Sequence, residues 1–419
     1  MGESMKKIMA LGLAVVFMVS MVLTGCGKSA GTGQEEAGKG GKVKIRFASW
    51  DSAEDLEDQQ KLVDAFNEQH DDIEVVLEAY GSDFDTKIAA GMGSGDAPDV
   101  MYMWNYPDYY EGLEPLDDYL AKEGEDFKAD FYETLWNYNS MDGKIYGIPV
   151  GFTTHCLFYN KDLFDQAGVA YPTSDWTWDD LEAAAKQIHE KLGIYGFSYG
   201  IKADAYDYEM YLWSNNTSYV GKDGKMDGYL NSPESVATFT MFQDMQKDGY
   251  ALAGEKGGRN EFSAQKSAMF IYGAWSINAF NEAGLNYGVV EIPAFAGSGH
   301  DSVSNLSTSG LAMSKDSKNK EAAWKFIKYW TGVELNKKRL GYEMSPHKSV
   351  VESEKIMEDP VYAPFYKMLE QSVGYTPTIF LTDKWSYISD ELSLSFEEIF
   401  NPNTLEDPQT VLDAVVAEQ

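Results

Sequence analysis

The sequence is poor in cysteine and histidine, and these shortages exclude several kinds of site. Its 419 residues include two cysteines, Cys26 and Cys156, too few for a framework of disulfides, so the folded part depends on its hydrophobic core. The five histidines show no H-x-x-x-H or Cys/His spacing, and the Asp-Gly-Lys stretches at 142–144 and 223–225 lack the alternating acids of a calcium loop. We therefore predict no metal site and no cofactor.

Basic residues are also scarce. Lys and Arg number 34 against 67 Asp and Glu, which gives a formal net charge of −33. Such a charge repels nucleic acids and anionic lipid surfaces, so we expect no nucleic-acid partner. Aromatic residues, in contrast, are abundant, with 10 Trp, 27 Tyr and 21 Phe. Several stand in polar, loop-like stretches, where packing in a core explains them poorly.

Long hydrophobic runs are limited to one, Ile8–Leu23, which follows the positive pair Lys6 and Lys7. Its length of about 16 residues is below the roughly 20 that cross a bilayer as a helix. We interpret residues 1–25 as a secretory signal peptide. The stretch Leu-Thr-Gly-Cys that ends at Cys26 resembles the bacterial lipobox, which implies that Cys26 is lipidated and begins the mature chain.

Residues 26–42 are rich in glycine and polar side chains and show no apolar period. A chain of this composition behaves as a flexible coil, with an r.m.s. reach of about 20 Å. We expect a lipid-anchored tether at the extracellular face of the cell membrane. The part that follows is long enough for two lobes with a large core.

The folded part opens with apolar runs of alternating strand and helix period. We expect a strand, a helix, a strand, a short helix and a third strand, at 42–52, about 54–69, 73–80, around 83–92 and 93–104. This order implies an α/β fold with a parallel, helix-covered sheet, which binds ligands at the carboxyl ends of its strands. Trp50-Asp51 and Trp104-Asn105-Tyr106 lie at such ends.

Six motifs in one order carry a resemblance to a known family. They are GSGDAPDV (93–100), DGKIYGIPVG (142–151), LFYNKDLFDQAGV (157–169), TWDDLEAAAKQI (177–188), SAMFIYGAWSI (267–277) and SKNKEAAWKFIKYWT (317–331). Together with the lipobox they resemble the extracellular solute-binding proteins of carbohydrate-uptake ABC transporters, related in plan to maltose-binding protein. The resemblance runs from about residue 43 to the C-terminus.

The resemblance implies a two-lobed, periplasmic-binding-protein-like fold, in which each lobe is a helix-covered, mainly parallel sheet and a multi-segment hinge joins the lobes. The residues favour one crossing at 147–151, and the resemblance places two more near 303–305 and 342–346. We assign residues to the lobes in discontinuous pieces: 43–149 plus 305–342 to lobe 1, and 150–304 plus 343–419 to lobe 2. Helices are expected at about 319–332, 361–373 and 387–400.

A sugar offers apolar C–H faces and a rim of hydroxyls, so its site needs aromatic rings and hydrogen-bonding groups. The candidates in loop-like stretches are Trp50, Asp51, Trp104, Asn105, Tyr106, Tyr208, Tyr211, Trp213, Tyr272, Trp275 and Trp385. The resemblance implies that Trp275, Trp385 and Trp104 stack on sugar rings and that Asp51 accepts bonds from hydroxyls. Thr153 stands where maltose-binding protein has a glutamate, which argues against maltose itself as the ligand.

Other aromatic residues are assigned to the structure. Trp136, Trp324 and Trp330 lie on amphipathic patterns and are expected in the core. Thr177 is predicted to be the N-cap of the helix that begins in SDWTWDDL.

We predict a monomeric, membrane-tethered receptor, without catalytic residues, that captures a sugar, favoured as an oligosaccharide, and delivers it to an ABC permease by lobe closure. One alternative is a lipid-anchored glycan-processing hydrolase. GFSYG at 196–200 fits the G-x-S-x-G elbow with Ser198 as nucleophile, although its context indicates a strand serine, and the many acids would supply a glycosidase pair by chance. The other is a receptor for a non-sugar solute such as a polyamine or a phosphorylated polyol.

Overall fold

A computed structural model of the chain describes residues 41–51, 53–200, 205–254, 258–341 and 343–418. The predicted signal peptide, Cys26 and nearly all of the predicted tether lie outside these residues. Contacts along the chain set Lys42–Gln419 apart as one compact unit. No helix in the described part of this unit combines the length and the apolar character needed to cross a membrane.

The first sheet has five strands in the order β2-β1-β3-β12-β6. Their bounds are β1 Val43–Ser49, β2 Ile73–Ala79, β3 Val100–Met103, β6 Gly147–Thr153 and β12 Ser307–Met313. β1 is parallel to β2 and β3, whereas β12 is antiparallel to both β3 and β6. A strand from late in the chain therefore lies inside a sheet whose other strands come from its first part.

The second sheet also has five strands, in the order β11-β7-β10-β8-β9. Their bounds are β7 His155–Asn160, β8 Tyr195–Gly200, β9 Ala251–Gly254, β10 Ser267–Gly273 and β11 Tyr287–Val290. β8 is parallel to β9 and β10, and β7 is antiparallel to β10 and β11. The short strands β4 (Ser140–Met141) and β5 (Lys144–Ile145) form a separate hairpin.

Each sheet packs against its own helices around its own hydrophobic core. In the first core the ring of Phe47 lies 5.0 Å from that of Phe326 and 4.9 Å from that of Trp330. The helices of this core are α1 Ala53–Gln69, α2 Phe84–Ser94, α3 Tyr106–Tyr109, α4 Asp117–Glu123, α5 Glu125–Ala129, α13 Lys320–Trp330 and α14 Val333–Lys338. α6 (Glu133–Tyr138) places buried side chains in both cores.

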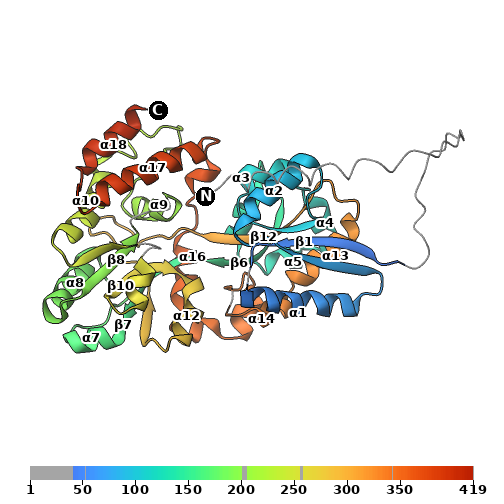
Figure 1. Cartoon of the computed structure of the whole chain (residues 1–419), viewed down its shortest axis with the longest axis horizontal. Helices are drawn as coiled ribbons and strands as arrows, with labels where there is room; N and C mark the ends of the chain where they lie inside the picture. Colours follow the sequence, from blue (N-terminus) through green and yellow to red (C-terminus); the bar gives the residue numbers. More distant parts are fainter. Residues whose placement is uncertain (1–40, 52, 201–204, 255–257, 342, 419) are drawn as a thin grey trace, which may run out of the picture. The chain divides into compact units, whose positions relative to one another are not determined.

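The second core is larger and rich in aromatic rings. Trp178 lies 5.3 Å from Phe242, and Tyr208 lies 5.1 Å from Phe396. Its helices are α7 Lys161–Ala167, α8 Trp178–Leu192, α9 Ala205–Ser214, α10 Pro233–Lys247, α11 Arg259–Ser263, α12 Ile277–Glu282, α15 Lys348–Ser353, α16 Ala363–Gln371, α17 Trp385–Phe400 and α18 Pro408–Ala417. Figure 1 shows α17 and α18 side by side, with α10 next to them.

Local sequence explains where several helices begin. Thr177 caps α8 in a capping box with Asp180, as predicted, because each residue's side chain bonds the other's backbone N–H. Ser232 caps α10, and Pro233 follows at the first helical position, where its missing N–H costs nothing. The predicted strands and helices of the first core, and those at about 319–332, 361–373 and 387–400, are confirmed to within a few residues, with one exception. The third strand, predicted at 93–104, is limited to Val100–Met103, because α2 continues to Ser94 and Gly95 caps its end.

Three chain segments pass between the two cores and lie against one another. The first joins β6 to β7, the second leads into β12, and the third includes Met344. In the first, Phe152 donates its backbone N–H to the carbonyl of Met344, which belongs to the third segment, at 3.3 Å. Thr153 pairs with Ser307 at the start of β12, and His155 donates its backbone N–H to Ser304 Oγ at 2.6 Å. These crossings lie at or next to the predicted ones. The assignment of every residue to one of two lobes stays a prediction.

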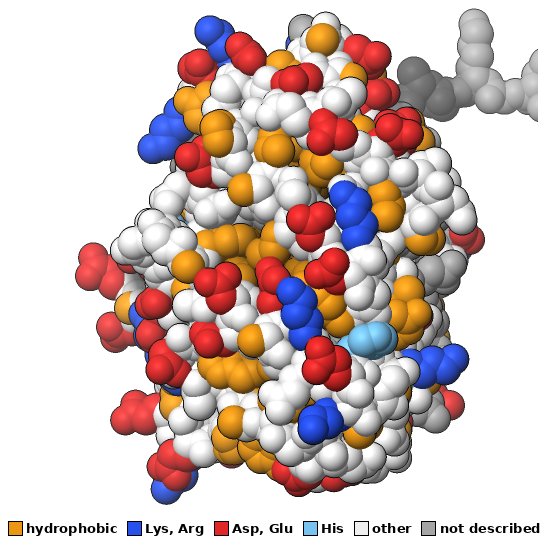
Figure 2. All heavy atoms as spheres, turned by 90° about the vertical axis from the view of Figure 1, so that its left-hand side faces the viewer, with side chains coloured by type: hydrophobic (Ala, Val, Ile, Leu, Met, Phe, Trp, Pro, Cys, Tyr) orange, Lys and Arg blue, Asp and Glu red, His pale blue; other side chains and the backbone are white. Residues whose placement is uncertain are grey.

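Acidic side chains cover much of the surface. Figure 2 shows Asp and Glu side chains spread over the face formed by the helices of the second core, in keeping with the net charge of −33. The predicted core tryptophans Trp136, Trp324 and Trp330 are buried, as expected.

Candidate ligand-binding site

Trp275 presents an indole face at the carboxyl end of β10. It lies in the 3₁₀ turn η4 (Ala274–Ser276), and 43% of the residue is exposed. A Cβ on Gly273 would lie 2.7 Å from two atoms of the indole, so the ring rests against this glycine's backbone, and a larger residue there would displace the ring. Tyr272 packs edge-on against Trp275 at 5.1 Å and 85°. One side of the indole is thus fixed and the rest is free to stack on a ligand.

The crossing from β6 to β7 supports the Trp275 turn. Thr153 Oγ1 accepts a hydrogen bond from the backbone N–H of Ala274 at 2.8 Å. His155 pairs with Gly273 across the β7–β10 ladder, and its ring stands perpendicular to that of Trp275 at 5.7 Å. Thr153, predicted to bind ligand, is 7% exposed and positions the neighbouring turn.

Asp207 adds a carboxylate to this cluster. It lies in the first turn of α9, and its Oδ1 is 3.5 Å from Nε2 of His155. Burial raises the pKa of Asp207, although 34% of its side chain is exposed. The carboxylate is thus partly shielded by the protein and still open to a ligand. The ring of Trp275 and the carboxylate of Asp207 therefore contact the same imidazole.

A second group of predicted residues lies at the carboxyl ends of β1 and β3. Trp104 is 46% exposed, and its side chain is hydrogen-bonded to the carboxyl of Asp85. Asp51 Oδ2 accepts a hydrogen bond from Ser49 Oγ at 2.9 Å. Trp50 is half-buried, with its ring 4.9 Å from that of Tyr102. An exposed indole and a carboxylate again stand at the edge of a sheet.

Four predicted aromatic residues lie in the cores, so we leave them out of the candidate site. The hydroxyl of Tyr106 donates to Asn139 Oδ1 at 2.7 Å, and that of Tyr208 donates to the carbonyl of Gly200 at 2.6 Å. The residues concerned are at most 5% exposed: Tyr106, Tyr208, Tyr211 and Trp213. The last three lie on α9, whose side chains from 208 to 214 are all buried. A ring enclosed on all sides offers no face to a ligand.

Two further predictions have a mixed outcome in the structure. Asn105 is the N-cap of α3, since its Oδ1 accepts from the backbone N–H of Asp108 at 3.3 Å. Trp385 begins α17 and is partly buried, with its ring 6.4 Å from that of Tyr219. Neither residue shares a described contact with Trp275, and their roles in binding stay predictions.

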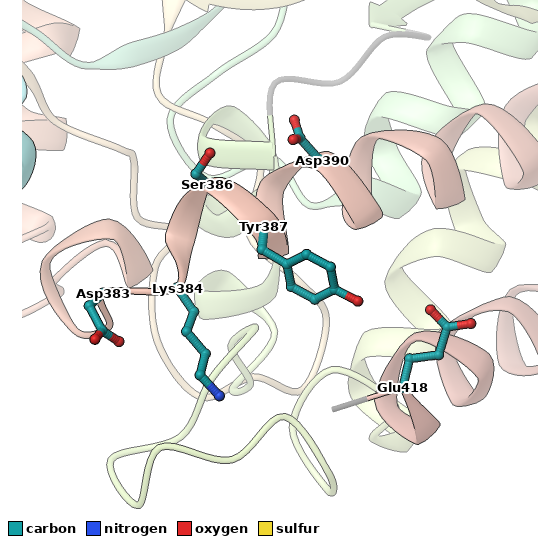
Figure 3. Close-up of a pocket in the computed structure, with 6 residues that line it drawn as sticks. All are labelled: Asp383, Lys384, Ser386, Tyr387, Asp390 and Glu418. Atoms are coloured by element: carbon teal, nitrogen blue, oxygen red, sulfur yellow. The ribbon is translucent and has the colours of Figure 1, made fainter.

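A surface hollow of about 660 Å³ lies beside Trp385. Figure 3 shows the residues that line it, with the ring of Tyr387 extending from α17 towards the end of α18: Asp383, Lys384, Ser386, Tyr387, Asp390 and Glu418. None of the predicted ligand-binding residues is among these lining residues. We therefore treat the hollow as separate from the candidate site.

Sequence reasoning missed two contributors to the Trp275 cluster: His155 and Asp207. A lone histidine before a strand indicates a core or surface role, and nothing in the sequence joins it to Asp207. A signal for Asp207 did exist in the stretch DAYDYEMYLW, where a carboxylate stands among aromatic residues. That composition is typical of a helix buried on all sides, whose acid lies at an open end.

Ser198 lies within β8 and is fully buried. Its hydroxyl donates to the carbonyl of Gly258 at 3.2 Å. A nucleophile elbow would hold this serine on a sharp turn after the strand, with the hydroxyl exposed. The interpretation of Ser198 as a strand serine is therefore confirmed.

Two helix-covered sheets, three crossing segments and exposed indoles at the strand ends define a class, the two-lobed substrate-binding proteins. Comparison with a family model agrees with this class. The chain belongs to the family of bacterial extracellular solute-binding proteins, whose model matches residues 49–337. The expected two-lobed α/β fold and the expected family are confirmed by this match and by the structural comparison below.

Several known proteins are similar to this chain. A binding protein of Brucella abortus is 31% identical over 256 residues, which make up 58% of this chain and 60% of the length of that relative. A galactooligosaccharide-binding protein of Bacillus subtilis is 26% identical over 356 residues, with 82% of this chain and 80% of that protein covered. The structure of an ABC substrate-binding protein from Listeria monocytogenes in complex with cycloalternan superposes with a TM-score of 0.77 at 26% identity, covering 90% of this chain and 98% of that one.

Proposed function

We propose that this chain is a receptor that captures a sugar, favoured as an oligosaccharide, outside the cell and hands it to an ABC permease. The observation that carries the proposal is the exposed indole of Trp275, which rests against Gly273 and Tyr272. The imidazole of His155 stands beside this indole and also lies 3.5 Å from the carboxylate of Asp207. An aromatic face suits the apolar C–H side of a sugar ring, and a partly shielded acceptor suits its hydroxyls.

The relatives support this class of ligand. The Bacillus relative is named for galactooligosaccharides, and the Listeria structure holds cycloalternan. Trp275 and Trp104 provide two exposed indoles, one at the edge of each sheet. A ligand of several rings would use both, whereas a single ring would occupy one.

The proposed mechanism is lobe closure about the three crossing segments. A sugar that binds first to the Trp275 cluster gains the contacts of Trp104 and Asp51 only when the lobes approach each other. Binding then shifts the equilibrium towards the closed state by the difference in its affinity for the two states. The closed state is what a permease would recognise.

We further propose that the receptor is held at the membrane by a lipid on Cys26 and by the tether that follows. Residues 26–42 are rich in glycine and polar side chains, which suits a flexible connection. On this proposal the chain has no catalytic role. Ser198, the residue suggested by the hydrolase motif, is fully buried and bonded to a backbone carbonyl.

Charge disfavours a phosphorylated polyol as the ligand. In the described part of the chain, Trp275 is contacted by Tyr272, Gly273 and His155, and that histidine stands beside a carboxylate. A phosphate is usually held by lysine, arginine or a row of backbone N–H groups. The acid beside His155 suits a polyamine better than a phosphate.

The test adds sugars of one to five rings, spermidine or glycerol 3-phosphate to the purified mature protein. Binding is measured by titration calorimetry, and the melting temperature of the protein is measured with and without each compound. Each bound ligand is recovered and its products are analysed. We expect intact oligosaccharides to bind and the polyamine and the phosphate to leave the melting temperature unchanged. Binding of spermidine or glycerol 3-phosphate alone, or cleavage of the sugar, would overturn the proposal.

A further inference from the structure

Asp207 lies in the candidate site, with its Oδ1 3.5 Å from Nε2 of His155. We propose that Asp207, held by His155, is a specificity-determining residue that accepts hydrogen bonds from hydroxyls of the sugar ring stacked on Trp275. This inference rests on the proposed function and names the group that selects among sugars.

The position of Asp207 is the first step. Its Oδ1 lies 3.5 Å from Nε2 of His155, and the same imidazole stands perpendicular to Trp275 at 5.7 Å. On this proposal, a ring stacked on the indole turns its rim of hydroxyls towards Asp207, which contacts the same imidazole. Since 34% of the Asp207 side chain is exposed, a ligand can reach it.

The second step is the rigidity of the turn that carries Asp207. The neighbouring Tyr206 donates its hydroxyl to the carbonyl of Leu306 at 2.5 Å, and its own carbonyl accepts from the side-chain amide of Asn305. Both partners belong to the segment that leads into β12. The carboxylate is thus held in place before ligand arrives, so binding need not order it.

The third step is the chemistry of the pair. An ionised carboxylate only accepts hydrogen bonds, and each sugar hydroxyl is a donor. Nε2 of His155 lies 3.5 Å from Oδ1 of Asp207, within ion-pair distance. The backbone N–H of His155 donates to Ser304 Oγ at 2.6 Å, which fixes the strand that carries the imidazole. His155 is a positioning residue, because it acts through Asp207.

The proposed role of Asp207 predicts which sugars the site rejects. A site built to pair a hydroxyl rejects an analogue without it, because the partly shielded carboxylate is then left without a donor. Removing the hydroxyl and removing the charge should therefore have the same effect, and doing both should add little to either. A double-mutant cycle between protein and ligand measures this coupling.

The experiment compares the full mature protein with Asp207→Asn by calorimetry. The probes are maltotriose, β-1,4-galactotriose and the monodeoxy analogues of the one that binds more tightly. Asp179→Asn is the matched control, because Asp179 also lies in the first turn of a helix of the second core and is exposed. We expect Asp207→Asn to weaken binding of the parent sugar at least tenfold and Asp179→Asn to leave it unchanged. One deoxy analogue should bind both Asp207 forms within about twofold of each other.

A second variant tests the role of His155. His155→Phe keeps a ring against Trp275 and Tyr272 and removes the nitrogen that faces Asp207. We expect it to weaken binding severalfold in the wild-type background and to have no further effect in the Asp207→Asn background. Additive losses would show that His155 acts independently and would overturn that part of the inference.

The outcomes separate this inference from the function on which it rests. If the wild type binds a trisaccharide and Asp207→Asn binds it equally well, the role of Asp207 is refuted and the sugar receptor stands. If every deoxy analogue loses the same affinity on Asp207→Asn as the parent does, the carboxylate has no hydroxyl partner, and the inference fails in the same way. If the wild type binds neither trisaccharide, the variants are compared with the tightest-binding sugar of the one-to-five-ring series. If no sugar of that series binds, the proposed function and this inference fall together.

Discussion

Replacing Trp275 by alanine is the most direct test of the candidate site, and its size follows from the structure. A tryptophan carries roughly 200 Å² of surface, and 43% of Trp275 is exposed and available to a ligand. Covering about 90 Å² at about 25 cal/mol per Å² is worth roughly 2 kcal/mol. Since 1.4 kcal/mol corresponds to a factor of ten, we expect Trp275→Ala to weaken sugar binding by roughly tenfold to fiftyfold.

The same substitution should cost little stability in the absence of ligand. Trp275 makes edge-on contacts with Tyr272 and His155, and pairs of this kind are worth about 0.5–1.5 kcal/mol each. In a protein of this size such a loss lowers the melting temperature by a few degrees at most. The assay is therefore calorimetry with the tightest-binding trisaccharide, beside a thermal melt of each protein without sugar.

Tyr387→Ala provides the control for this experiment. Tyr387 is 48% exposed, close to the value of Trp275, and it lines the separate hollow of Figure 3. We expect this variant to keep both affinity and melting temperature. The reasoning is refuted if Trp275→Ala melts many degrees lower and binds sugar as tightly as the wild type, because the indole would then be a core residue.

Three further substitutions test other features. Gly273→Ala places a Cβ 2.7 Å from the indole, so it should weaken sugar binding severalfold, as measured by calorimetry. The control is Gly93→Ala, whose Cβ has no atom within 4 Å and should leave the affinity unchanged. Equal affinities of the two variants would contradict the close approach of Gly273 to the indole. Burial raises the pKa of Glu209 from 4.5 to about 8, so the folded protein keeps a proton that the unfolded chain loses, and its contribution to stability falls as the pH rises from about 4.5 to 8. Melts across this range should show a shallower decline for Glu209→Gln, and an identical slope would count against the shift. Cys26→Ser should move the protein from the detergent phase to the aqueous phase in a Triton X-114 partition if that cysteine carries the lipid, and no movement would speak against the anchor.

The sequence was most informative where one periodic pattern covers a whole element. The stripe that gives α1 and the capping box of α8 depend on neighbours a few residues apart, so they were predicted closely. The position of Trp275 was predictable for a similar reason, since small residues surround it and no helical stripe includes it. Local patterns of this kind survive tertiary packing.

Prediction failed where packing decided the outcome. α9 has aromatic side chains on all sides, and its polar neighbours made Tyr208, Tyr211 and Trp213 resemble loop residues. Burial against α10 and α17 turned them into core. The pair of His155 and Asp207 joins a strand to a distant helix, and only the tertiary fold brings its members together.

The place of β12 has a consequence for how the chain is made and exported. This strand, Ser307–Met313, lies inside the first sheet between β3 and β6, and until it arrives those two strands lack their shared neighbour. Contacts between residues so far apart in sequence form slowly. About three quarters of the chain must therefore leave the ribosome before the first core can close. During that interval the part of the chain that forms the first core stays unfolded. An unfolded chain is the form that can be threaded through a narrow pore.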